Sequence, residues 1–110
     1  YLLFQNKKSL KITNEIFNLF NKFCKSKKIF PIVLFLPKFK GEFSDEKNLL
    51  YLREKVKKSN IPNLYPKKEF VDLNGKTIKK YYCLKNHYSF LGGKIIANSV
   101  FEFLKNSKLL

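Results

Sequence analysis

The fold is decided by residues 29–37, which read Ile29-Phe30-Pro31-Ile32-Val33-Leu34-Phe35-Leu36-Pro37. Every side chain in this stretch is apolar, and lysines stand on both sides of it at Lys28 and Lys38. A short apolar run of this kind is typical of a β-strand covered on both faces, as in a parallel sheet. Pro31 lies near the start of the expected strand, where its missing N–H is tolerated.

A helix is expected on the N-terminal side of this strand, from Ser9 to the basic turn Ser26-Lys27-Lys28. Apolar residues recur there at the spacing of one helical face, and asparagines and lysines take the other face. The apolar face consists of Ile12, Ile16, Leu19, Phe20, Phe23 and Cys24. We expect the phenylalanines Phe17, Phe20 and Phe23 to belong to the core.

Three further elements are expected on the C-terminal side. Ser44 is a good N-cap for a helix that should stop near Ser59-Asn60, ahead of a proline. A second, shorter strand is expected over residues 61–65, and a turn at Asn74-Gly75 predicts a small excursion. A last helix opens at Ser89 and carries an apolar stripe to Leu104. This alternation of helices and strands predicts an α/β layered domain with a parallel sheet.

The beginning of the chain also affects the domain assignment. The sequence contains no methionine and starts at Tyr1. Two strands do not form a stable parallel sheet by themselves. We therefore expect further residues ahead of Tyr1, and we expect residues 1–110 to be the C-terminal part of one domain.

The net charge of +15 raises the question of a nucleic-acid partner. Only Arg53 among the 23 basic residues is an arginine, whereas specific readers of nucleic acids favour arginine for its bidentate geometry. The lysines are dispersed, and joint enrichment in Lys, Asn, Ile, Phe and Tyr is typical of an AT-rich genome. No specific nucleic-acid partner is expected on these grounds.

Cysteine and histidine content limits the remaining site types. Cys24 and Cys83 lie far apart in sequence, which indicates neither a zinc knuckle nor a disulfide framework. A single histidine with scattered carboxylates has no metal-ligand spacing, so no metal and no cofactor is expected. The longest apolar run is far too short to span a bilayer, so no transmembrane segment is expected. Localisation stays open between the cytoplasm and the cell envelope.

Residues 87–104 carry a more specific pattern, which reads His-Tyr-Ser-Phe-Leu-Gly-Gly-Lys-Ile-Ile-Ala-Asn-Ser-Val-Phe-Glu-Phe-Leu. This segment resembles the final conserved block of the SGNH/GDSL hydrolase superfamily of esterases and acyltransferases. That block has a histidine, then Ser or Asn, then Gly, followed by a helix with Ile-Ala and an apolar stripe. The residues that fit in register are His87, Ser89, Gly92, Ile96 and Ala97.

The resemblance implies both a fold and an activity. It implies a three-layer α/β/α flavodoxin-like sandwich, of which this chain is the C-terminal portion. It also implies a serine ester hydrolase or O-acyl transfer enzyme in which His87 is the general base. The serine nucleophile and the oxyanion-hole residues would lie outside this chain. The substrate would be a small-molecule, glycan or lipid ester.

One departure from the family pattern affects the histidine. The family usually places an aspartate three residues before it, where this chain has Leu84. Asn86, Asp72 or a backbone carbonyl could instead orient the imidazole. A Ser–His dyad would still work, because the third member mainly fixes the tautomer and stabilises the imidazolium. The alternatives are a non-catalytic binding or envelope-assembly domain of the same fold, and a basic module that binds nucleic acid or anionic membranes.

Three other features around this block have structural explanations. Ser89 is expected to be a helix N-cap rather than a nucleophile. Gly92 and Gly93 are expected to allow close packing, because no phosphate-loop spacing surrounds them. The pair Tyr81-Tyr82 is expected either to line a substrate cleft or to pack inside the fold.

Overall fold

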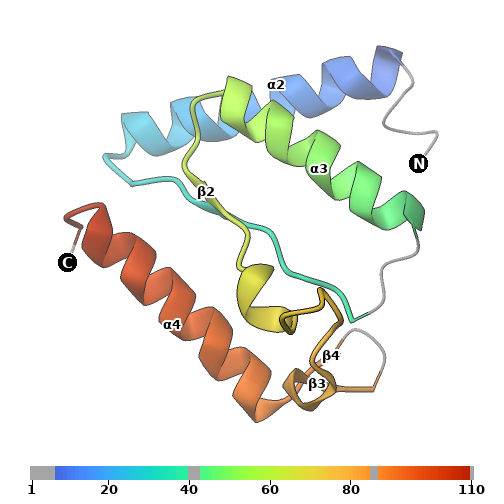
Figure 1. The fold of residues 1–110 in the computed structure, drawn as a ribbon. Coiled ribbons are helices and arrows are strands. Elements are labelled where there is room, and N and C mark those ends of the chain that lie inside the picture. The colour runs from blue at the N-terminus through green and yellow to red at the C-terminus, as the bar shows by residue number, and fades with distance from the viewer. Residues whose placement is uncertain (1–6, 40–42, 85–86, 110) are drawn as a thin grey trace. The chain divides into compact units, whose positions relative to one another are not determined.

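A computed structural model describes residues 7–39, 43–84 and 87–109 of the chain. It divides into two compact units. Unit 1 comprises Tyr1–Phe35 and Gly41–Asn63, and unit 2 comprises Leu36–Lys40 and Leu64–Leu110. Within the described residues, long helices combine with short paired strands, as Figure 1 shows. The expectation of mixed α/β content is confirmed at this level.

Unit 1 contains two long helices, strand β1 and the first residue of strand β2. Helix α2 (Lys7–Ser26) precedes strand β1 (Val33–Leu34), and helix α3 (Phe43–Lys58) precedes strand β2 (Asn63–Leu64). The two strands form one parallel pair. The extents of both helices agree with those expected from the apolar spacing and the following polar turns. The amide side chain of Asn21 donates a hydrogen bond of 3.2 Å to the carbonyl of Ser59, which ties α2 to the end of α3.

The helix ends explain where the core of unit 1 forms. Lys28 and Asn60, which follow α2 and α3, adopt left-handed backbone conformations with φ of 55° and 57°. The N–H of the next residue then donates to a carbonyl five residues back, from Ile29 to Cys24 and from Ile61 to Val56. These bonds define Schellman caps, which often bring apolar residues together across the turn. Among the described residues of unit 1, the buried apolar ones all belong to these caps: Cys24, Val56 and Ile61.

Two expectations about unit 1 are wrong. Only Val33–Leu34 forms strand structure within the expected strand, and Phe30 is 45 % exposed, so the stretch is not covered on both faces. The expected phenylalanine core is also absent, because Phe20 and Phe23 are exposed and Phe17 is only half-buried. Apolar spacing identifies the face of a helix, but it does not supply the layer that covers it.

Unit 2 consists of short elements followed by one long helix. Two 3₁₀ turns, η1 (Lys68–Phe70) and η2 (Lys79–Tyr81), precede strands β3 (Tyr82–Cys83) and β4 (His87–Tyr88). Helix α4 (Phe90–Asn106) ends the unit. The expected excursion is confirmed: an isolated antiparallel bridge pairs Val71 with Thr77, and Gly75 between them has a φ of +76°. A positive φ is easily reached by glycine because it has no Cβ.

Aromatic rings build the core of unit 2. Phe70 is 1 % exposed and meets the rings of three tyrosines in edge-to-face contacts, each with centroids 5.6 Å apart. These tyrosines are Tyr81, Tyr82 and Tyr88. Offset and edge-to-face contacts of this kind stabilise beyond the area that the rings bury, by about 0.5–1.5 kcal/mol per pair. The cluster therefore stabilises the β3–β4 hairpin, which carries His87.

Candidate functional site

His87 lies on the β3–β4 hairpin and its side chain is exposed. The strands pair antiparallel, with Tyr82 opposite Tyr88 and Cys83 opposite His87. Directly opposed residues of an antiparallel pair share one face of the sheet. One face of this hairpin therefore presents a thiol and an imidazole to solvent, while Tyr82 and Tyr88 occupy the other face.

The tyrosine face anchors the hairpin. The hydroxyls of Tyr82 and Tyr88 both donate hydrogen bonds to the carbonyl oxygen of Pro37, that of Tyr82 over 3.0 Å. Burial, with smaller contributions from Tyr88 and Tyr65, raises the pKa of the Tyr82 phenol above its ordinary range. Burial likewise raises the pKa of the Tyr88 phenol. Both phenols are therefore held in the neutral form, which is the form that donates to a carbonyl.

Ser89 connects the hairpin to α4. Its hydroxyl accepts a hydrogen bond of 3.2 Å from the N–H of Gly92 and donates one of 2.7 Å to the carbonyl of Lys80. Its backbone N–H donates to the carbonyl of Tyr81 over 3.0 Å. The expectation that Ser89 is the N-cap of the last helix is confirmed. His87 thus stands two residues ahead of the N-cap of α4, which is held by side-chain and backbone hydrogen bonds.

The two glycines of the first turn behave differently. A Cβ on Gly92 would lie 2.0 Å from the carbonyl oxygen of Tyr81, so the expected close packing is confirmed there. A Cβ on Gly93 would meet nothing within 4 Å, so the expectation of close packing is wrong for Gly93.

Of the residues considered for orienting the imidazole, Asp72 is engaged within its own turn. The carboxylate of Asp72 accepts hydrogen bonds from the backbone N–H groups of Asn74 and Lys76, at 2.8 and 2.9 Å, within its own turn. Asn86 lies outside the described residues. Leu84 is 85 % exposed and has a φ of +54°. Across residues 7–39, 43–84 and 87–109, the structure shows no hydrogen bond to the imidazole of His87.

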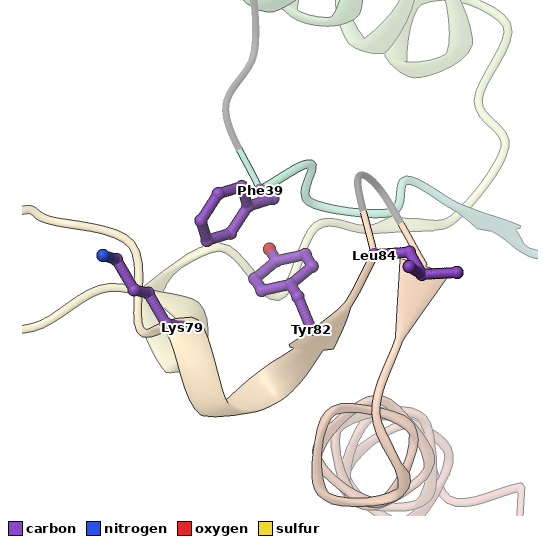
Figure 2. A pocket seen from close by; sticks show the side chains of 4 residues that line it. All are labelled: Phe39, Lys79, Tyr82 and Leu84. Carbon is purple, nitrogen blue, oxygen red and sulfur yellow. The ribbon is translucent and has the colours of Figure 1, made fainter.

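A cavity of about 220 Å³ lies beside the hairpin in unit 2. Figure 2 shows four described residues that line it, with the rings of Phe39 and Tyr82 between Lys79 and Leu84. The two rings meet edge to face with centroids 5.3 Å apart. The expected packing of Tyr82 inside the fold is confirmed, and the same residue also lines this cavity. Sequence reasoning missed Phe39 and Lys79. The signal for Phe39 was its place after the apolar stretch, since ligand crevices in α/β sheets lie beyond the carboxyl ends of strands.

In the described part of the chain, no group of three His, Cys, Asp or Glu side chains is arranged to hold a metal ion. Cys24 is buried and Cys83 is exposed, and both are free thiols. Among the helices of the described ranges, none has both the length and the apolar character required to cross a bilayer.

Comparison with known proteins assigns no family and no function to the chain. No protein-family model, no curated protein and no solved structure matches the chain.

Proposed function

We propose that this chain is the C-terminal part of a serine ester hydrolase or O-acyl transfer enzyme of the SGNH type, with His87 as its general base. The fold of the whole domain would be the three-layer α/β/α flavodoxin-like sandwich. The proposal is supported by the resemblance of residues 87–104 to the family's histidine block. The observation that carries it is that the only histidine of the chain is exposed on an anchored hairpin directly ahead of an N-capped helix.

This placement suits a general base in two respects. The base must reach the hydroxyl of the nucleophile, so its imidazole has to be accessible. It must also return to the same geometry after every turnover, so the backbone that carries it has to be fixed. The exposed side chain of His87 meets the first requirement. The hydroxyls of Tyr82 and Tyr88 on the Pro37 carbonyl support the second.

The proposed reaction follows from the properties of imidazole. The neutral ring would take the proton of a serine hydroxyl as that oxygen attacks the ester carbonyl carbon. The resulting imidazolium would then give the proton to the departing alkoxide, and an acyl-enzyme would remain for transfer to water or another hydroxyl. The nucleophilic serine would come from a part of the domain outside this chain. The substrate class would be small-molecule, glycan or lipid esters.

We propose a Ser–His dyad rather than a full triad. The carboxylate of Asp72 is already hydrogen-bonded within its own turn, and Leu84 replaces the family's usual aspartate. An imidazole without a carboxylate partner gains less stabilisation as it becomes charged. The dyad should therefore turn over more slowly than a triad of the same fold.

The same two observations favour a second candidate, a non-catalytic binding domain of this fold. A domain that binds without catalysis does not need a carboxylate near its histidine. The two candidates differ in one consequence: only the enzyme requires the imidazole of His87 for a chemical step.

An experiment on the full-length protein separates them. Hydrolysis of short p-nitrophenyl esters is compared among the wild type, His87→Ala and Cys83→Ala, with circular dichroism to check folding. Cys83 is the matched control because it lies opposite His87 and is also exposed. The enzyme proposal expects His87→Ala to lose activity and Cys83→Ala to keep it. A folded wild type that hydrolyses no ester and reacts with no fluorophosphonate probe would favour the binding domain.

A further inference from the structure

Leu84 has a backbone conformation that its side chain disfavours. Four described residues other than glycine have a positive φ, namely Lys28, Asn60, Leu84 and Lys108. Lys28, Asn60 and Lys108 each follow a helix and form its Schellman cap, which accounts for their conformation. Leu84 follows no helix but comes directly after β3, at the start of the turn to β4, where a positive φ is common for glycine and asparagine but carries a steric cost for leucine. Its side chain is 85 % exposed, so burial does not compensate for the strain.

Strain of this kind is often retained where a residue serves a site. Leu84 lines the cavity that also contains Phe39, Lys79 and Tyr82. In Figure 2, Leu84 stands on one side of the aromatic pair and Lys79 on the other. The left-handed conformation therefore places an exposed apolar side chain at the rim of a cavity with aromatic walls.

The walls favour an aromatic occupant. The ring of Phe39 meets the ring of Tyr82 edge to face, with 5.3 Å between centroids. Tyr82 cannot turn freely, because its hydroxyl is bonded to the Pro37 carbonyl and its ring packs on Phe70. Fixed ring faces and edges accept another ring in offset or edge-to-face geometry. At about 220 Å³ the cavity is below the usual range of ligand pockets, which favours a single small ring.

The charge favours an anion. Among the described residues that line the cavity, Lys79 is the charged one. Its long side chain can keep its ammonium group in water while its methylenes cover the apolar wall. The net charge of +15 adds attraction for anions and repulsion for cations.

We propose that this cavity is a binding site for small aromatic carboxylates, in which the ring contacts Phe39, Tyr82 and Leu84 and the carboxylate pairs with Lys79. The site goes beyond the esterase proposal, because it requires neither His87 nor a nucleophile. It holds equally for an enzyme and for a binding domain.

The test is an NMR titration of the full-length protein with three probes at low ionic strength. Benzoate carries both a ring and a charge, benzyl alcohol carries the ring alone, and propionate carries the charge alone. The proposal expects benzoate to bind most tightly and to shift the resonances of Phe39, Tyr82 and Leu84. It is overturned if benzoate leaves these resonances unchanged, or if either of the other two probes binds as tightly.

Variants then assign the roles of the two rim residues. Lys79→Gln should weaken benzoate binding roughly two- to fivefold at low salt, whereas Lys76→Gln, an exposed lysine outside the cavity, should not. Leu84→Gly should weaken binding without lowering the melting temperature. Equal effects of Lys79→Gln and Lys76→Gln would overturn the carboxylate contact. Full benzoate affinity in Leu84→Gly would overturn the role of the strained leucine.

Discussion

The carbonyl oxygen of Tyr81 lies where a side chain on Gly92 would have to be, 2.0 Å from the place of its Cβ. The same oxygen accepts a hydrogen bond from the N–H of Ser89, so it cannot move away without breaking the start of α4. Gly92→Ala should therefore destabilise the protein, by about 1–3 kcal/mol as in other overpacked sites. Urea unfolding followed by circular dichroism measures this loss.

Gly93 is the control for that substitution. It occupies the same helical turn, and a Cβ there would meet nothing within 4 Å. Gly93→Ala should raise the free energy of unfolding by about 0.5–1 kcal/mol, because alanine loses less backbone entropy in a helix. If both alanine variants were stabilising, the close approach of the Tyr81 carbonyl to Gly92 would be contradicted.

Ser89 should contribute to stability through its cap. Ser89→Ala removes the acceptor for the Gly92 N–H and the donor to the Lys80 carbonyl. We expect a loss of about 1 kcal/mol in the free energy of unfolding. Ser99→Ala serves as the control, because the Ser99 hydroxyl donates only to the Ile95 carbonyl within the same helix. Its effect should stay within about 0.5 kcal/mol, and a loss equal to that of Ser89→Ala would contradict the cap.

The buried Tyr82 and the half-buried Tyr88 should make the protein sensitive to alkali. The folded-state pKa values of Tyr82 and Tyr88 are raised above those in the unfolded chain, which lie at about 10. The contribution of the two neutral phenols to the free energy of unfolding is thus fully present below about pH 10. It is lost as the pH rises through the folded-state pKa values. Tyr82→Phe should show a shallower decline in unfolding free energy above about pH 10. Unfolding curves at several pH values test this, and parallel declines in the two proteins would refute it.

Leu84→Gly should stabilise the hairpin. Glycine adopts a φ of +54° without the steric cost of about 1–2 kcal/mol that other residues bear there. The exposed leucine side chain contributes little burial to oppose this gain. Leu73→Gly is the matched control, since Leu73 is fully exposed but does not have a positive φ. Thermal unfolding should show a higher midpoint for Leu84→Gly alone, and a lower midpoint would contradict the assigned strain.

The helices of this protein follow closely from its sequence. Apolar spacing and polar turns predict α2, α3 and α4, and Ser89 is a recognisable cap. Each of these signals acts within a few residues, so it does not depend on the rest of the molecule. The close approach at Gly92 could also be predicted from the sequence. Glycine in a first helical turn weakens the helix, so a compensating close contact is expected there.

The extent of strand β1 and the lining of the cavity were harder to predict from the sequence. An apolar run indicates burial, but only Val33–Leu34 forms strand structure, because pairing requires a neighbouring strand in register. Phe39 and Lys79 lie 40 residues apart in the sequence and line the same cavity through tertiary packing, which no local periodicity encodes. The conformation of Leu84 runs against its own preference, so only a structure reveals it.

The most direct test of the proposed function is the kcat/KM for ester hydrolysis of His87→Ala relative to the wild type, in the full-length protein. Because general-base catalysis typically contributes about 10²–10⁴-fold, we expect the ratio to fall by that factor while the fold is retained. Cys83→Ala should stay near the wild-type value. If the folded His87→Ala protein hydrolysed esters as fast as the wild type, the assignment of His87 as general base would be contradicted.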